Sequence, residues 1–147
     1  MTGTRLPCEG PTRPVDPLWH RARRRAALTA VLLAAAASAG CRPGGLPAER
    51  AARLTGGSPA HGAQLIRGFG CGACHTIPGI PGAQGQVGPP LAGLVGRAYI
   101  GGVLTNTVPH LVRWLMDPRA VDSLTAMPAL GLTEAEARDI SAYLYTR

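Results

Sequence analysis

The sequence contains no lysine and few aromatic side chains. All 15 basic residues are arginine, which we attribute to genome composition rather than to function. Glycine and proline are abundant, with 20 and 14 residues. A core built from these side chains would be thin, and a large bound apolar group would compensate for that. The aromatic residues are Trp19, Phe69, Tyr99, Trp114, Tyr143 and Tyr145.

The charge distribution argues against nucleic-acid binding. The formal net charge is +7, but most of it lies near the N-terminus. Residues 42–147 hold nine arginines against six acidic residues, which leaves only +3. That part of the chain shows no basic cluster and no aromatic platform for stacking bases. It also has no Ser/His/Asp set, no paired carboxylates and no phosphate-binding glycine loop, so we expect no enzyme.

The first forty residues resemble an export signal. Arg21 and residues 23–25 form a basic cluster, and residues 26–37 form an apolar run that only Thr29 interrupts. A basic segment, a short apolar run and small residues are typical of a secretory signal peptide. The run is too short for a transmembrane helix, which needs about 20 apolar residues. We therefore predict a signal peptide over residues 1–40.

Cys41 follows the small residues Ala39 and Gly40, an ending that resembles a bacterial lipobox. Ser38 departs from that motif, which usually has leucine there. We predict that Cys41 is lipidated and that residues 41–57 form a flexible tether. Two alternatives are open, namely that the apolar run stays as an anchor or that cleavage near Ala39 leaves an unmodified cysteine.

The run Cys71-Gly72-Ala73-Cys74-His75 is a C-x-x-C-H haem-attachment motif. Two thiols at this spacing can each form a thioether to one vinyl group of a single haem. The adjacent His75 imidazole is then placed to be the proximal iron ligand. Export suits this chemistry, because bacteria attach haem covalently outside the inner membrane.

Three other interpretations of the motif are weaker. A zinc site would need two further Cys or His ligands at a suitable spacing. A thioredoxin-like redox pair would need a βαβ context, and no segment near Cys71 resembles a strand. A disulfide between Cys71 and Cys74 would leave His75 without a role.

Helix signals follow in three places. Ser58 and Pro59 predict a helix start, and this helix should extend to about Phe69. Residues 109–116 form a second predicted helix, and Thr133 with Glu136 forms a capping box for the last one. Residues 77–90 contain four prolines and four glycines and must be a loop. No segment alternates like a strand, so we predict an all-α fold of three or four short helices.

From Ser58 to Arg147 the chain resembles a class I cytochrome c of the small, membrane-associated bacterial kind. The motifs occur in the family's order, which is more specific than any single motif. The matching segments are Cys71–His75, Gly88–Leu91, Leu111–Leu115 with Pro118, Thr125–Pro128 and the C-terminal helix from Ile140 to Leu144.

The resemblance implies roles for several residues. The Pro89 carbonyl should accept a hydrogen bond from the proximal imidazole, which orients that ligand. Arg97 should lie near a haem propionate. Further residues that should line the haem pocket are Tyr99, Trp114 and Thr125.

The second axial ligand decides what such a haem does. The candidates are Met116, Met127, His61 and His110. Met116 lies in a predicted helix and suits a core position, while His61 and His110 lie in or at the start of helices. Met127 lies in a predicted loop, from which a thioether can reach the iron, and the resemblance also favours it.

We therefore expect a one-electron carrier with one covalent haem c and His75/Met127 ligation. Its expected place is the outer face of the inner membrane, in a respiratory chain. Its expected partners are proteins such as a terminal oxidase or a quinol-oxidising complex. The alternatives are a haem-based sensor or ligand-binding module, and an accessory haem subunit of an oxidase or dehydrogenase complex.

Overall fold

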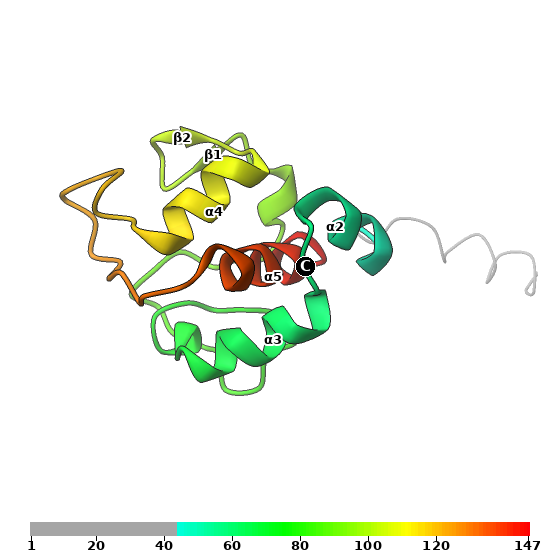
Figure 1. Cartoon of the computed structure of the whole chain (residues 1–147). Coiled ribbons are helices and arrows are strands. Elements are labelled where there is room, and N and C mark those ends of the chain that lie inside the picture. The colour runs from blue at the N-terminus through cyan, green and yellow to red at the C-terminus, as the bar shows by residue number, and fades with distance from the viewer. Residues whose placement is uncertain (1–43) are drawn as a thin grey trace, which may run out of the picture. The chain divides into compact units, whose positions relative to one another are not determined.

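Helix α5 (Glu134–Tyr145) lies at the centre of the computed structural model, which describes residues 44–147. Three further helices pack against α5, and Figure 1 shows α3 and α4 on its two sides. In chain order, the remaining elements are α2 (Ala48–Thr55), α3 (Pro59–Gly68), the 3-10 turns η1 (Cys71–Ala73) and η2 (Leu94–Gly96), strands β1 (Tyr99–Ile100) and β2 (Leu104–Thr105), and α4 (Val108–Met116).

Side-chain caps begin three of these helices. The Ser58 hydroxyl accepts a hydrogen bond from the third backbone N–H of α3, as the sequence predicts. Thr107 caps α4, which begins one residue before the predicted start at Pro109. Thr133 and Glu136 form the predicted capping box of α5, with both of its reciprocal hydrogen bonds present.

Helices α3 and α5 approach closely where α3 has a glycine. A Cβ on Gly62 would lie 2.0 Å from the backbone oxygen of Asp139, so no other residue fits there without moving the helices apart. Beside this crossing, Ile66 and Ile140 are each only 1% exposed. The close contact between α3 and α5 therefore fixes where α3 ends and the Cys71–His75 segment begins.

The predicted flexible tether is wrong for the part that the structure describes. Residues 48–55 form α2, which packs on α5 with Ala51 and Thr55 completely buried. The Arg138 guanidinium donates to the Thr55 carbonyl over 2.9 Å, and the Leu46 N–H donates to the Tyr145 carbonyl over 2.6 Å. Small residues make this contact, so the sequence showed no strongly apolar stripe.

The expectation of no strand also needs correction. β1 and β2 pair antiparallel, with Tyr99 opposite Thr105 and Ile100 opposite Leu104. Two-residue strands are too short to show an alternating pattern. The hairpin buries Ile100 and holds Tyr99 outward, with 58% of its surface exposed.

The described part of the chain begins after the predicted export segment. The signal peptide, the apolar run 26–37 and Cys41 all lie outside residues 44–147. Within those residues, no helix has the length and apolar character needed to cross a membrane.

Candidate functional site

The Cys71–His75 segment turns sharply away from the end of α3. Gly70 has a φ of 70°, a conformation that favours glycine, and the chain then forms the 3-10 turn η1. The His75 N–H donates to the Cys71 carbonyl over 3.0 Å. Cys71 and Cys74 are both free thiols and half-buried. Burial raises the pKa of the Cys71 thiol, so this side chain is uncharged at neutral pH before any attachment.

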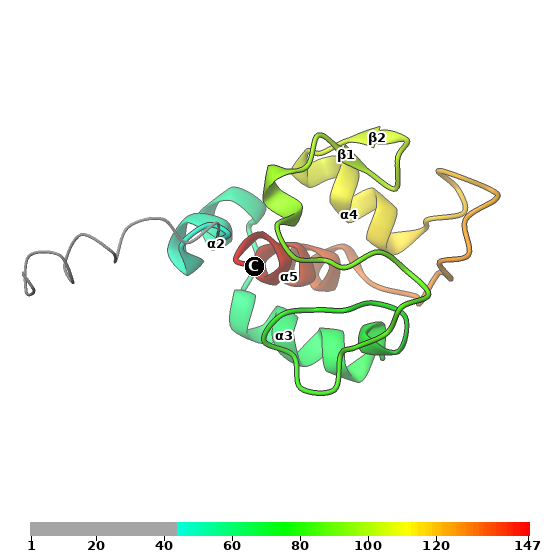
Figure 2. The same cartoon turned by 180° about the vertical axis from the view of Figure 1, so that it is seen from behind.

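The loop 76–93 folds back against this segment (Figure 2). The Gly85 N–H donates to the Gly72 carbonyl over 3.0 Å, and the Gly88 N–H donates to the Cys74 carbonyl over 2.8 Å. Glycine is required at the first of these contacts, because a Cβ on Gly85 would lie 2.4 Å from the Ala73 oxygen. The repeated glycines of this loop therefore allow two backbone segments to touch.

The His75 imidazole is held by a single hydrogen bond to the loop. Its Nδ1 lies 2.8 Å from the Pro89 carbonyl oxygen, which is the contact that the family resemblance implies. Because a carbonyl only accepts, Nδ1 carries the proton and Nε2 keeps the lone pair that a metal needs. Gly88 makes room for the ring, since a Cβ there would lie 2.3 Å from it.

These side chains border a cavity of about 440 Å³, which is mostly lined by apolar atoms. Of the described residues that line it, only Arg97 and Asp122 carry a formal charge at neutral pH. Every candidate pocket residue from the sequence lines this cavity: Cys71, Cys74, His75, Pro89, Arg97, Tyr99, Trp114, Thr125 and Met127.

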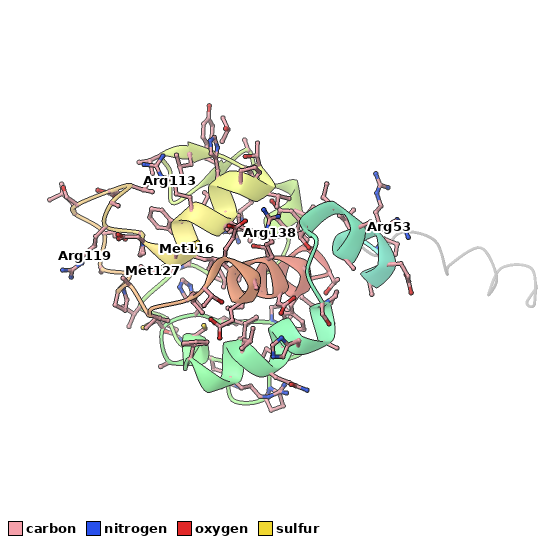
Figure 3. All side chains as sticks on the ribbon, viewed as in Figure 1. Arg53, Arg113, Met116, Arg119, Met127 and Arg138 are labelled. Atoms are coloured by element: carbon pink, nitrogen blue, oxygen red, sulfur yellow. The ribbon has the colours of Figure 1, made fainter. Side chains whose placement is uncertain are left out.

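Of the four candidates for a second iron ligand, only Met127 reaches the cavity. It lies on the loop between α4 and α5, while Met116 ends α4 (Figure 3). The Met127 N–H donates to the Thr125 hydroxyl over 3.2 Å. His61 is instead paired with Asp139 at 2.7 Å, and His110 bonds to Thr105.

Sequence reasoning missed several residues that shape the cavity. Gly101 lies against the Trp114 ring, where a Cβ would come within 2.5 Å of it. Leu94 and Ile100 are buried and line the wall. The apolar character of Leu94 and Ile100 gave only a core signal, and nothing in the sequence paired Gly101 with Trp114.

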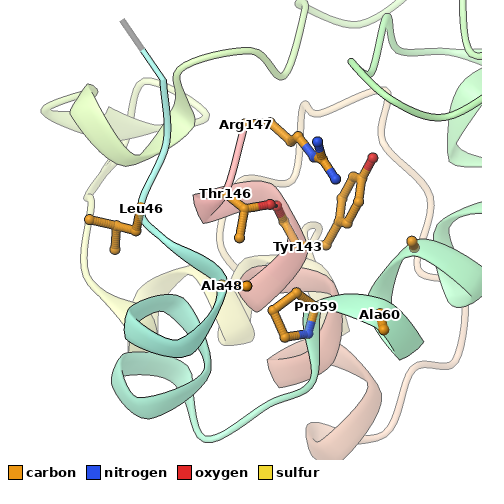
Figure 4. Close-up of a pocket in the computed structure, with 8 residues that line it drawn as sticks. Leu46, Ala48, Pro59, Ala60, Tyr143, Thr146 and Arg147 are labelled. Carbon is orange, nitrogen blue, oxygen red and sulfur yellow. The ribbon is translucent and has the colours of Figure 1, made fainter. Parts of the chain in front are cut away.

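A second hollow of about 370 Å³ lies between α3, the start of α2 and the C-terminus (Figure 4). Arg147 lies over the Tyr143 ring there, 4.4 Å from its centre. None of the described residues that line this hollow is a cysteine, histidine or methionine. Within residues 44–147, no three Cys, His, Asp or Glu side chains cluster as a metal site, so that part of the chain offers no further ligands for the zinc interpretation of the motif.

Comparison with known proteins gives the same family that the site residues indicate. A family model described as cytochrome c matches residues 59–147. This chain belongs to the cytochrome c family. The predicted all-α cytochrome c fold is therefore confirmed, and the cofactor of this c-type cytochrome is a covalently bound haem c with its iron. No curated protein and no solved structure matched the chain.

The residues present fit that cofactor. The two thiols, an imidazole whose Nε2 lone pair is free and an apolar hollow together match the groups that hold haem c. The general role of this cytochrome is haem-based electron transfer. Helix α2 precedes the residues that the family model matches.

Proposed function

We propose that this cytochrome is a one-electron carrier with His75 and Met127 as axial iron ligands. Cys71 and Cys74 form the thioethers to its haem. The observation that carries the proposal is that one cavity brings these four side chains together and excludes Met116, His61 and His110.

When bound, the haem iron supplies reversible one-electron chemistry. His75 is oriented for it by the Pro89 carbonyl. The Met127 thioether would stabilise the reduced iron and so raise the potential. The apolar lining would keep water away from the haem, and His75 and Met127 together would leave the iron no position for a substrate.

We propose a carrier rather than an enzyme. The charged side chains that line the cavity in the described chain are Arg97 and Asp122, from different segments. Neither contacts a nucleophile or a second carboxylate in the hydrogen bonds of the structure. The cavity therefore offers the haem site but no acid–base machinery beside it.

The partners we propose are redox proteins of a respiratory chain, such as a terminal oxidase or a quinol-oxidising complex. Two of the large exposed apolar side chains, Val87 and Tyr99, line the cavity. Their exposed fractions are 78% and 58%. Exposed apolar groups at a functional cavity suit contact with another protein, which would bring a partner close to the haem.

We also propose export and lipid anchoring through Cys41, so that the domain works at the outer face of the inner membrane. The support is the signal-like sequence, together with the export that haem attachment needs. Membrane fractionation of the full chain and of Cys41→Ser tests this, with intact mass to detect the lipid. Equal membrane binding of both proteins would show that the apolar run is the anchor instead.

The test of the ligand assignment compares two methionines. Met127→Ala should remove the sulfur–iron absorption band of the ferric protein, lower the midpoint potential and allow carbon monoxide to bind the ferrous form. Met116→Leu is the matched control and should change none of these, because a volume-conserving swap costs less than about 1.5 kcal/mol.

The opposite pattern would make Met116 the ligand. If neither variant differs from the wild type, His61 or His110 must be reconsidered as the second ligand. Carbon monoxide binding by the wild-type ferrous protein would support the sensor alternative. Haem that survives denaturing electrophoresis confirms covalent attachment, and haem lost in acid–acetone extraction contradicts it.

A further inference from the structure

We propose that Asn106 and Tyr145 are positioning residues for the Arg97 guanidinium beside the haem. They would set the reduction potential without touching the cofactor. This inference rests on the proposed function, because it concerns the electrostatics of the same cavity. It uses a hydrogen-bonded chain that joins the C-terminal helix to the cavity wall.

Arg97 is the one cationic side chain among the described residues that line the cavity. Haem carries two propionate carboxylates, and a buried or half-buried carboxylate needs a cation or several donors nearby. The backbone already orients the Arg97 guanidinium, since this group donates to the carbonyls of Pro90 and Ala92. Arg97 therefore supplies the positive charge that acts on the iron.

Asn106 holds the backbone that carries Arg97. Its side-chain amide donates to the Arg97 carbonyl over 2.9 Å and to the Leu94 carbonyl over 2.7 Å. Its own N–H donates to the Ala98 carbonyl over 2.9 Å. One residue thus ties three carbonyls of the turn from η2 to β1.

Tyr145 completes this arrangement from α5. Its hydroxyl donates to the Asn106 side-chain oxygen over 2.8 Å, and the residue is only 3% exposed. With this bond the Asn106 amide uses both donors and its acceptor. Burial raises the pKa of Tyr145, which keeps the hydroxyl protonated and donating. The rigid helix therefore orients the amide that orients Arg97.

The expected effect is on the potential. A positive charge held near the iron stabilises the extra electron of the ferrous form. If the turn loosens, the Arg97 guanidinium samples positions farther from the haem, and the midpoint potential falls. A looser guanidinium also stabilises ionised propionate less well, so the midpoint should vary more with pH.

The test uses the haem-loaded full chain and a matched pair of tyrosines. Tyr145→Phe should lower the midpoint potential and steepen its pH dependence. Tyr143→Phe is the control, because Tyr143 lies on the same helix, is 2% exposed and donates to a loop carbonyl, that of Pro78, over 2.8 Å. It should lose similar stability with a smaller change in potential.

A double-variant cycle shows whether Tyr145 acts through Arg97. Arg97→Gln should lower the midpoint more than Tyr145→Phe does. Adding Tyr145→Phe to Arg97→Gln should then give little further shift. If the two shifts add, or if Tyr145→Phe matches Tyr143→Phe, the positioning role is wrong. Asn106→Leu, which keeps a similar size, removes the amide donors and adds no charge, gives a second measurement should Tyr145→Phe fold poorly.

A different result would contradict the proposed function. A wild-type protein that binds no haem, or whose haem shows no reversible one-electron couple, contradicts the carrier assignment. A normal wild-type couple with an unchanged Tyr145→Phe potential contradicts the positioning role alone.

Discussion

The two sides of the haem cavity are held in different ways. On the cysteine side, the hydrogen bonds join segments well separated in sequence, such as Gly72 with Gly85 and Thr76 with Leu91. On the methionine side, the loop from 118 to 132 is held differently. Every hydrogen bond that the structure shows for these described residues is local, as from Thr125 to Asp122 and from Met127 to Thr125.

This difference indicates which of the two proposed iron ligands is easier to release. The His75 side cannot open without breaking bonds to another part of the chain. The Met127 loop is buried at its ends by Pro118 and Leu132, and the partly buried Met127 and Leu130 also pack on the core. Its hydrogen bonds, however, lie only within its own turns. Segments with few tertiary hydrogen bonds open at low free energy. Of the two proposed ligands, the Met127 thioether is thus the one that the fold holds less firmly.

The largest effect should be seen in native-state hydrogen exchange. We expect amides of the loop, including those of Thr125 and Met127, to exchange at least about a hundredfold faster than those of Gly88 and Leu91. That ratio corresponds to about 3 kcal/mol of local opening free energy. Equal protection on both sides would remove the contrast between them.

A substitution on the cysteine side of the cavity should have the next largest effect. Gly88→Ala places a Cβ 2.3 Å from the His75 ring. Crowding of this kind costs about 1–3 kcal/mol. We expect lower thermal stability and poor haem incorporation. Gly96→Ala is the control, because nothing lies within 4 Å of a Cβ at that position. Similar losses from both variants would contradict the steric explanation.

Removing the N-terminal cap of α5, where the methionine loop ends, should have a smaller effect. Thr133→Ala removes a capping hydroxyl and should cost about 1 kcal/mol of stability. It should also speed exchange in the adjacent methionine loop. Thr107→Ala removes the equivalent cap of α4, at the end away from that loop. We expect it to destabilise the protein similarly while leaving loop exchange unchanged, and faster loop exchange there would argue against a local effect.

The smallest effect concerns pH. Hydrogen bonds from the Thr133 backbone and hydroxyl lower the pKa of Glu136 below its ordinary value of 4.5. A pKa that is lower in the folded state gives stability that is present above pH 4.5 and is lost as the pH falls through the folded value. Glu136→Gln should therefore be less stable than the wild type at neutral pH. The two proteins should converge in acid, and a difference that stays constant with pH would contradict this.

The residues that start helices made most of the fold predictable from the sequence. Ser58, Thr133 and Glu136 marked helix starts because caps act locally and leave a local signature. Helix α2 was missed because its contact uses Ala51 and Thr55, which are small and common on helix surfaces. Its partner residues lie about ninety positions later, and no local pattern announces a contact of that separation.

The site was predictable where chemistry dictates spacing. Cys71, Cys74 and His75 must be adjacent to serve one haem, so their order in the sequence is itself a signal. Asn106 gave no signal, because its partner Tyr145 is 39 positions away and neither residue type is specific to haem proteins. Roles that depend on long-range hydrogen bonds become visible only in three dimensions.

The docking of the segment before α3 limits how far this cytochrome could move. Since Leu46 is hydrogen-bonded to Tyr145, the length of chain from Cys41 to Leu46 would limit the distance between the lipid and the domain in a lipid-anchored protein. Five residues span at most about 17 Å. A domain held by so short a linker would diffuse in two dimensions at the bilayer surface. Under the proposed anchoring, it would meet only partners whose redox centres lie near that surface.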